Sequence, residues 1–378
     1  MKKMKSAFLY LLVTVVLLSA CRGETPADKK PALKSAFAGR FYIGTALNAS
    51  QITGRDSAGI RVVKEQFNAI VAENCMKSAE IQPREGEFDF SLADRFADFG
   101  VENGMFITGH CLIWHSQAPR WFFTDSLGNN VSAEVMTERM RNHIHTVVGR
   151  YKGRIKGWDV VNEAILEDGS YRKSKFYEIL GESFIPLAFQ FAHEADPDAE
   201  LYYNDYNEWY PGKRDAIVQM VRNLKAGGIR IDGIGMQGHI GLDSPSLEDY
   251  EAAMVAYANE GMKVMVTELD LSILPNRRRD VGADIATNME YQQELNPYAD
   301  GLVPQEKQDE WDARMLDFFS LFLKHSGDVS RVTLWGVSDG DSWKNNFPVR
   351  GRTDYPLLFD RNHQPKSAVE KIIELTKE

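Results

Sequence analysis

The chain has 378 residues, of which 43% are hydrophobic, 11% aromatic and 26% charged. This composition is ordinary for a globular protein and excludes an intrinsically disordered chain. The formal net charge of −10 argues against a nucleic-acid-binding protein, which needs a basic surface to neutralise phosphates. Three cysteines are too few for a small disulfide-stabilised scaffold.

The first residues have the pattern of an export signal. Three lysines precede an apolar run, Ala7–Leu18, which is too short to cross the roughly 30 Å hydrocarbon core of a bilayer as a helix. Small residues and then Cys21 follow, as in a bacterial lipoprotein signal, where the cysteine is lipidated and becomes the new N-terminus. We expect residues 1–20 to be a lipoprotein signal peptide and residues 21–36 to be the lipidated cysteine and a polar tether. The alternative is an ordinary secretory signal with a chance cysteine.

The chain that follows alternates short apolar segments with helical patterns. Eight segments are short and apolar, as expected for strands buried on both faces of a sheet. The predicted strands are Phe41–Leu47, Ala69–Ala72, Met105–Thr108, Ile155–Val161, Leu201–Tyr203, Gly233–Met236, Lys263–Thr267 and Arg331–Val337.

Helix boundaries lie between these strands. Ser132 precedes apolar residues that are spaced for one face of a helix. Ser246 and Asp249 resemble a capping box at the start of another helix, which Gly261 ends. A further helix begins at Ser91.

Eight strands that alternate with helices predict one closed (β/α)8 TIM barrel, which is an α/β fold, over residues 37–378. The alternative is an open, doubly wound sheet, but no glycine-rich phosphate loop follows any strand. Residues 274–308 are expected to form a long loop after the seventh strand.

Polar residues follow the strands at the positions where a barrel of this kind carries its active site. Buried polar groups are costly unless hydrogen-bonded, so their number at one rim indicates a functional cleft. Glu163 follows the fourth strand and Glu268 the seventh, together with amides and three tryptophans. Two carboxylates across a cleft suit glycoside hydrolysis, with retention of configuration at a separation of about 5–5.5 Å and inversion at a wider one. The sequence leaves that distance open.

The motifs of this rim occur in a specific order along the chain. They are FNAIVAENCMK (67–77), GHCLIWHSQAPRW (109–121), WDVVNEA (158–164), YYNDYN (202–207), GMQGHI (235–240), VTELDLS (266–272), WGVSDGDSW (335–343), PLLFD (356–360) and QPKSA (364–368). Together they resemble glycoside hydrolase family 10, most of whose members are endo-1,4-β-xylanases. The resemblance extends from about Phe41 to Ala368.

The resemblance implies a retaining hydrolase that cleaves internal β-1,4-xylosidic bonds of xylan through a covalent glycosyl-enzyme intermediate. Glu163 would be the general acid/base and Glu268 the nucleophile. Asn162 would bind the 2-hydroxyl of the sugar on the nucleophile side. His239 would hydrogen-bond Glu268, with Asp270 behind it, so that Glu268 stays ionised while Glu163 stays protonated.

The same resemblance implies substrate-binding residues. Gln237 would lie beside the cleavage point, and Trp335 and Trp343 would wall the sugar and favour a pentose. Asn204 and Tyr206 would face the leaving group. The residues expected to line the glycone subsites are Glu73, Asn74, Lys77, His110, Trp114 and Gln117.

Other residues are left with open or structural interpretations. Cys75 and Cys111 follow predicted subsite residues on neighbouring strands, so a disulfide and two buried thiols are both compatible with the sequence. His143 and His145 lie two apart on a helix and are expected at the surface. Trp209 is either a sugar platform on the leaving-group side or a packing residue. Arg277–Arg279 is a solvated charge run or a contact for an acidic sugar branch.

The expected partner is xylan or xylo-oligosaccharide. The alternatives are another β-glycan or an aryl glycoside cleaved by the same mechanism, or a catalytically inactive, glycan-binding surface lipoprotein. The resemblance implies no metal and no cofactor. We expect no nucleic-acid partner and a monomer. We also expect a membrane contact only through the lipid on Cys21, at the outer membrane of the bacterial cell envelope.

Overall fold

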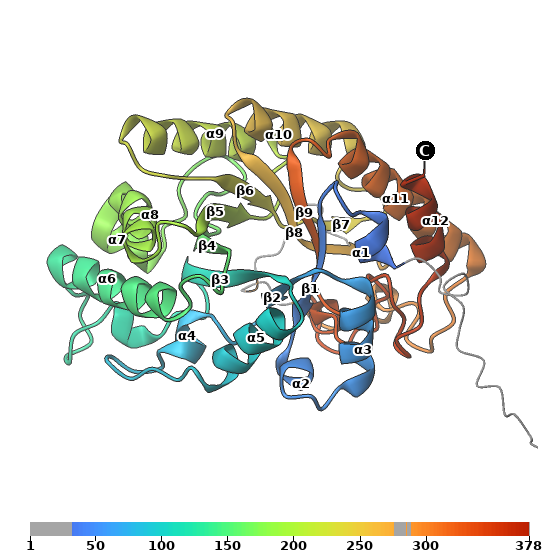
Figure 1. Ribbon diagram of the computed structural model, residues 1–378, viewed down its shortest axis with the longest axis horizontal. Coiled ribbons are helices and arrows are strands. Elements are labelled where there is room, and N and C mark those ends of the chain that lie inside the picture. The colour runs from blue at the N-terminus through green and yellow to red at the C-terminus, as the bar shows by residue number, and fades with distance from the viewer. Residues whose placement is uncertain (1–31, 276–284, 286–288, 378) are drawn as a thin grey trace, which may run out of the picture. The chain divides into compact units, whose positions relative to one another are not determined.

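The computed structural model describes residues 32–275, 285 and 289–377. Its centre is a ring of parallel strands surrounded by helices (Figure 1). The strands follow the order β6-β5-β4-β3-β2-β1-β9-β8, and β6 also pairs with β8, which closes the ring. The predicted (β/α)8 barrel is thus confirmed, and the open sheet is excluded. The strands of the ring are β1 (Tyr42–Leu47), β2 (Ala69–Ala72), β3 (Phe106–Trp114), β4 (Gly157–Asn162), β5 (Glu200–Asp205), β6 (Gly233–Met236), β8 (Lys263–Ser272) and β9 (Val329–Leu334).

Two strands run further than their apolar segments. β3 continues through His110 to Trp114, and β8 continues through Glu268 and Asp270. Polar residues that we expected just after a strand are therefore held inside it. A short strand, β7 (His239–Gly241), was not predicted, and it pairs in parallel with the end of β8.

The helices outside the ring lie between successive strands (Figure 1). The predicted helix starts are confirmed, since Ser132 and Ser246 cap α6 and α10 by accepting from the N–H groups of Val135 and Asp249. The longer helices are α3 (Ser57–Gln66), α5 (Ser91–Glu102), α6 (Ala133–Arg150), α8 (Phe184–Ala195), α9 (Pro211–Ala226), α10 (Leu247–Asn259), α11 (Gln305–Lys324) and α12 (Ser367–Leu375). Shorter ones are α1 (Leu33–Ala36), α2 (Ala49–Ile52), α4 (Ser78–Ile81) and α7 (Lys175–Leu180).

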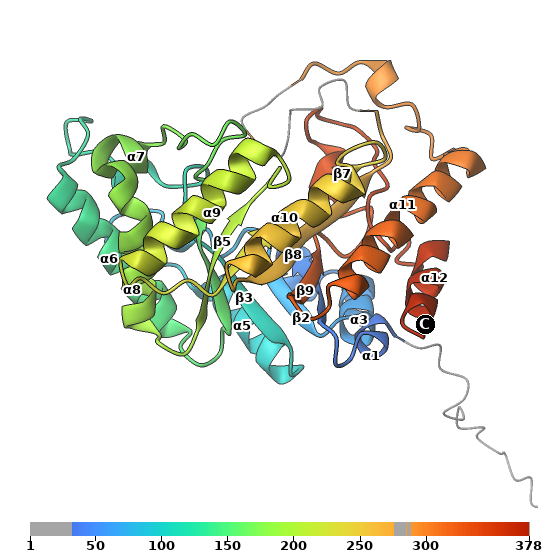
Figure 2. The ribbon, with the colours of Figure 1, turned by 90° about the horizontal axis from the view of Figure 1, so that it is seen from above.

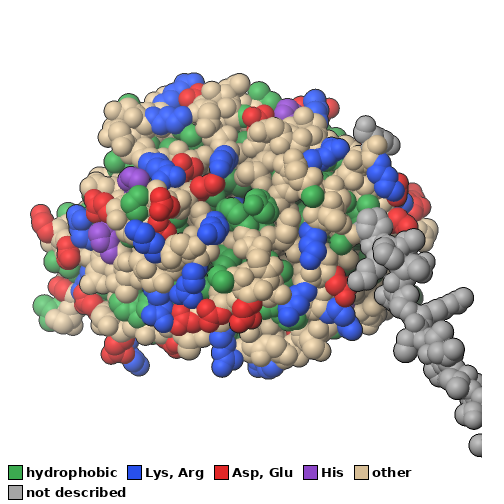
Figure 3. All heavy atoms as spheres, viewed as in Figure 1, with side chains coloured by type: hydrophobic (Ala, Val, Ile, Leu, Met, Phe, Trp, Pro, Cys, Tyr) green, Lys and Arg blue, Asp and Glu red, His purple; other side chains and the backbone are tan. Residues whose placement is uncertain are grey.

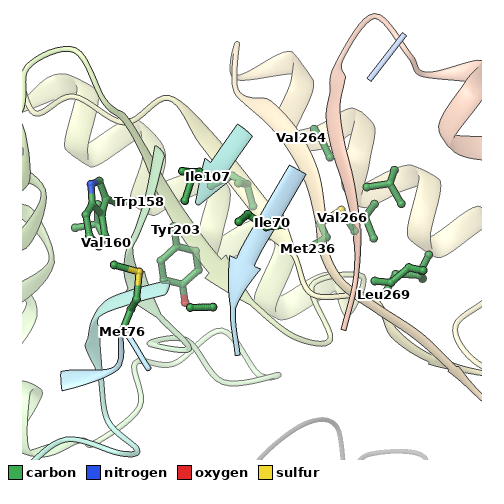
Figure 4. Packing of buried hydrophobic residues seen from close by; sticks show 14 of the residues in the cluster. Ile70, Met76, Ile107, Trp158, Val160, Tyr203, Met236, Val264, Val266 and Leu269 are labelled. Carbon is green, nitrogen blue, oxygen red and sulfur yellow. The ribbon is translucent and has the colours of Figure 1, made fainter. Parts of the chain in front are cut away.

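One large apolar cluster joins the strands to the helices, and part of it is drawn in Figure 4. Glycines in the strands make room for its large rings. A Cβ on Gly109 would lie 2.1 Å from the ring of Trp158, and one on Gly157 would lie 2.4 Å from Tyr202. The strand glycines therefore belong to the packing of the barrel, which sets the positions of the strand ends.

The folded domain begins before residue 37. We expected a tether through residue 36, but Leu33–Ala36 forms α1, and the side chain of Leu33 is fully buried in the main cluster. Those four residues are therefore part of the domain, because they add to its core. The predicted signal peptide, Cys21 and the rest of the tether lie outside the described residues.

None of the helices in the described part of the chain has the length and apolarity needed to span a membrane. On the face drawn in Figure 3, Lys and Arg side chains are mixed with Asp and Glu, and no basic stripe is visible there.

Candidate active site

A cavity of about 130 Å³ lies at the carboxyl ends of the strands. Most of the predicted site residues line it, whereas Asp270, Asn204 and Tyr206 do not. The predicted residues in its wall are Glu73, Asn74, Lys77, His110, Trp114, Gln117, Asn162, Glu163, Gln237, His239, Glu268, Trp335 and Trp343.

Glu163 follows β4 and is only 4% exposed. One carboxylate oxygen, Oε2, accepts from the indole N–H of Trp114 at 2.8 Å, and Oε1 accepts from the amide of Gln237 at 3.1 Å. Burial and the nearby charges of Asp205 and Glu268 outweigh these hydrogen bonds and raise the pKa of Glu163 to about 7. Near neutral pH this carboxyl group can therefore carry the proton that a general acid donates.

Glu268 has the opposite environment, inside β8. Its Oε1 accepts from Asn204 Nδ2 at 2.8 Å, and its Oε2 lies 3.2 Å from His239 Nε2. Burial alone would raise the pKa of Glu268, but the hydrogen bond from His239, the proximity of His110 and the hydrogen bond from Asn204 outweigh it, so the pKa is lowered. Glu268 is therefore an ionised carboxylate beside a protonated one, which is the division that acid and nucleophile need.

His239 connects Glu268 to a third carboxylate. Its Nδ1 lies 2.9 Å from Asp270 Oδ2, and that same oxygen accepts from the indole N–H of Trp343 at 2.8 Å. Burial opposes a charge on His239, but Asp270 and Glu268 raise its pKa above the usual value, while the pKa of Asp270 is lowered by His239 and Lys344 against the effect of burial. This charged chain fixes Glu268 in one orientation.

Amide side chains join the two halves of the site. Asn204 Nδ2 donates to Asn162 Oδ1 at 2.9 Å as well as to Glu268, and Asn162 Nδ2 donates to Glu163 Oε1 at 3.2 Å. The relative placement of the two carboxylates thus depends on hydrogen bonds between side chains at the ends of different strands.

The glycone side of the cavity is built around Lys77. Its Nζ donates to Asn74 Oδ1 at 3.0 Å and to Gln117 Oε1 at 2.9 Å, and it lies 4.8 Å from the centre of the Trp114 ring. These groups are the donors and acceptors that sugar hydroxyls require, on an aromatic surface. Trp335 and Trp343 also line the cavity, and they belong to a small apolar cluster separate from the main core.

Asn204 and Tyr206, which we expected to face the leaving group, are both buried. Asn204 is fully buried, and its side-chain amide holds Glu268. Tyr206 is 3% exposed, and its hydroxyl accepts from Arg172 at 2.7 Å. Its ring also lies against Lys213, with the Nζ 4.1 Å from the ring centre. Neither residue lines either of the two cavities described here, and their contact with the leaving group stays a prediction.

A second, larger cavity of about 480 Å³ adjoins the first at His239, which lines both. Trp209, for which the sequence left two interpretations, lines this cavity. It also packs on Tyr250, with 5.8 Å between the ring centres. The segment before α11, orange in Figure 2, projects beyond the helices and contributes Pro297 and Tyr298 to the wall. The predicted contact of Arg277–Arg279 lies outside the described residues.

The structure also settles the open interpretation of the two cysteines and the expected position of His143. Cys75 and Cys111 are both buried free thiols, so the disulfide is not formed. His143 is fully buried, and its Nδ1 lies 2.8 Å from Gln82 Oε1, so the expected surface position is wrong. Burial lowers the pKa of His143 to about 4. The sequence did carry a signal for this burial, because Met140 and Val147 lie three and four positions away on the same face of α6.

Several residues that hydrogen-bond to site residues or change their pKa were not among the predicted site residues. Asp159 Oδ2 lies 2.9 Å from His110 Nδ1, and Thr267 donates to Asn204 Oδ1 at 2.6 Å. Asp205 raises the pKa of Glu163 and is itself paired with Lys213 at 2.9 Å. The motif YYNDYN contains Asp205, but its partner lies eight positions later on α9, where sequence alone does not show the contact.

A protonated carboxyl and an ionised carboxylate that face one sugar-sized cavity in a (β/α)8 barrel are the features of a glycoside hydrolase. The comparisons with known proteins agree. The family model described as glycosyl hydrolase family 10 matches residues 32–375, and the chain belongs to this family.

Relatives and solved structures of the same kind cover nearly all of the chain. Endo-1,4-β-xylanase A of Xylanibacter ruminicola is 50% identical over 349 residues, which is 92% of this chain and 94% of that protein. Endo-1,4-β-xylanase B of Paenibacillus barcinonensis is 41% identical, over 91% of this chain and 98% of that one. The structure of a GH10 endoxylanase retrieved from a sugarcane soil metagenome superposes with a TM-score of 0.88 at 44% identity, covering 91% of this chain and all of that one.

Proposed function

We propose that this protein is a retaining endo-1,4-β-xylanase. The observation that carries the proposal is the pair Glu163 and Glu268, which line one cavity with pKa values shifted in opposite directions. Family membership and the printed names of relatives at up to 50% identity support xylan as the substrate.

The reaction follows from these protonation states. Glu268 attacks the anomeric carbon, and the bond to the leaving oxygen breaks as Glu163 gives that oxygen its proton. A covalent glycosyl-enzyme remains, and the negative charge of Glu268 is gone. The pKa of Glu163 then falls, so Glu163 takes a proton from water, which attacks the anomeric carbon and releases Glu268.

The walls of the two cavities support a chain-like substrate. The smaller cavity offers Lys77, Asn74 and Gln117 to sugar hydroxyls, while Trp335 and Trp343 limit its width and favour a pentose without a hydroxymethyl group. The larger cavity begins at His239 and has room for leaving-group sugars. Sugar sites on both sides of the cleavage point favour an internal cut.

The test is product analysis on linear β-1,4-xylan, with Glu268→Ala as the control. We expect a mixture of short xylo-oligosaccharides early in the reaction from the wild type and none from the variant. A folded wild type that releases no product from xylan, but cleaves another β-glycan or an aryl glycoside, would contradict the assigned substrate. Binding of xylan without cleavage of any of these would contradict catalysis.

We also propose that the protein is a lipid-anchored monomer of the bacterial cell envelope, at the outer membrane, with Cys21 as the lipidated residue. The support is the lysine-rich start, the apolar run Ala7–Leu18 and the small residues before Cys21. A Cys21→Ala variant should leave the membrane fraction when cells are fractionated. A variant that stays in that fraction would contradict the anchor.

A further inference from the structure

The backbone of the acid/base residue has an uncommon conformation. Glu163 has φ = 58°, in the left-handed region that residues with a Cβ rarely adopt. Its N–H donates to the carbonyl of Asn204 at 2.9 Å, and its carbonyl accepts from Arg172 Nε at 3.0 Å. Such a conformation persists only where neighbouring groups hold it, so the contacts just after Glu163 are informative.

Those contacts converge on one hydroxyl group. The hydroxyl oxygen of Tyr203 accepts from the backbone N–H of Ala164 at 3.0 Å and from that of Ile165 at 3.1 Å. The same hydroxyl donates to Asp205 Oδ2 at 2.5 Å. A hydroxyl has one proton and two lone pairs, so all three are used here. Figure 4 shows the ring of Tyr203 among buried apolar side chains, with the hydroxyl at its end.

The acceptor of that proton is itself fixed. Asp205 Oδ1 accepts from Lys213 Nζ at 2.9 Å and from the backbone N–H of Tyr206 at 2.9 Å. Tyr203, Asp205 and Lys213 have no exposed surface. Because the hydroxyl group of Tyr203 donates its hydrogen bond to Asp205, both of its lone pairs are free to accept from the two N–H groups after Glu163.

We propose that Tyr203 is a positioning residue for the acid/base. Its hydroxyl, oriented by Asp205 and Lys213, holds the backbone after Glu163 so that the carboxyl group of Glu163 stays aimed at the glycosidic oxygen. Tyr203 does not line the described catalytic cavity, so it acts only through Glu163. The inference rests on the proposed function, because it concerns the proton that Glu163 transfers.

Proton transfer is sensitive to such an anchor. General acid catalysis contributes about 10²–10⁴-fold, and it is lost when donor and acceptor are misaligned. A substrate with a poor leaving group needs that proton when its glycosidic bond breaks. A 2,4-dinitrophenyl glycoside does not, because its leaving group departs as a stable anion. The ratio of kcat/KM for these two substrates therefore reports the acid alone, and it is independent of the fraction of enzyme that is folded.

The experiment compares Tyr203→Phe with Tyr202→Phe. Tyr202 precedes Tyr203 on β5, is also buried, and donates its hydroxyl proton to Glu200 at 2.7 Å. Successive residues of a strand point to opposite faces, so this control removes a similar buried hydroxyl away from Glu163. The substrates are xylohexaose and 2,4-dinitrophenyl β-xylobioside.

We expect Tyr203→Phe to lower the kcat/KM ratio of xylohexaose to the dinitrophenyl substrate by about tenfold or more, within the range of the acid's contribution. Tyr202→Phe should leave the ratio within about twofold of the wild type. If Tyr203→Phe yields no folded protein, Asp205→Asn replaces it, measured well below pH 7, where Glu163 carries its proton with or without the charge of Asp205. The ratio should then fall in the same direction but by less, since an amide oxygen still accepts from Tyr203.

Equal ratios in Tyr203→Phe, Tyr202→Phe and the wild type would overturn the inference, as would an unchanged ratio in Asp205→Asn if Tyr203→Phe does not fold. Failure of the proposed function has a different appearance, because the wild type itself would then cleave neither xylosidic substrate.

Discussion

Asn204 donates its side-chain amide to Glu268 Oε1 at 2.8 Å, from directly beneath the nucleophile. Gly235 makes this position possible, since a Cβ there would lie 2.3 Å from Asn204 Oδ1. The amide also donates to Asn162, which in turn donates to Glu163. Two buried amide side chains thus connect the nucleophile to the acid/base.

Removing that amide should therefore reduce catalysis more than binding. We expect Asn204→Ala to lower kcat on xylan by about 10²-fold, as for other preorganised donors, with little change in KM. Asn204→Asp should be at least as damaging, because it replaces the donor with a second acceptor beside Glu268. Steady-state kinetics on xylo-oligosaccharides measure both. A variant with Asp at this position and near-native kcat would contradict the role of Asn204.

The pH dependence of activity should be bell-shaped. The low-pH limb reports protonation of Glu268, whose pKa is lowered, and the high-pH limb reports loss of the proton from Glu163, whose pKa is about 7. Activity is thus lost as pH falls through the first value and as it rises through the second. With a dinitrophenyl xyloside, kcat/KM should lose its high-pH limb, because no acid is needed. The limb persisting unchanged would contradict the assignment of Glu163.

Two glycine substitutions should change stability in opposite directions. A methyl group on Gly109 would meet the buried ring of Trp158 at 2.1 Å, so Gly109→Ala should lower the free energy of unfolding by about 1–3 kcal/mol. Gly149 lies near the end of α6, and a Cβ added there would meet no atom within 4 Å. Gly149→Ala should therefore raise the free energy of unfolding by up to about 1 kcal/mol. Urea denaturation of the two variants measures both changes, and equal effects would contradict the packing described for β3.

The two buried cysteines should be unreactive in the folded protein. Burial raises the pKa of Cys75 to about 12, and burial also places the pKa of Cys111 well above its usual value. The thiolate is the reactive form, so a Cys21→Ser variant should show no reaction with a disulfide reagent until it is unfolded. Two thiols should then titrate. Fewer than two in the unfolded, unreduced protein would reveal a disulfide.

The barrel and most of the cavity wall could be predicted because the patterns that mark them lie in short, continuous stretches of the sequence. Short apolar segments mark the strands, and polar residues interrupt them where the site lies. β7 could not be found in this way, since a strand of three residues that ends in a glycine carries no periodic pattern. The carboxylates were found because Glu163 and Glu268 interrupt apolar strands that otherwise have no reason to contain them.

What escaped prediction depends on contacts between distant residues. The register between β4 and β5 shifts between Asp159 and Val161, and such an irregularity decides which side chains face the cavity. The Asp205–Lys213 pair joins a strand to a helix, and the burial of His143 depends on Gln82, 61 positions earlier.

The most direct test of the two-carboxylate account is the configuration of the first product. Proton NMR during early hydrolysis of xylohexaose by the wild type should show the β-anomer of the new reducing end before mutarotation. This result requires two displacements, with Glu268 as the nucleophile and Glu163 as acid and then base. Initial release of the α-anomer would mean a single displacement by water and would contradict the account.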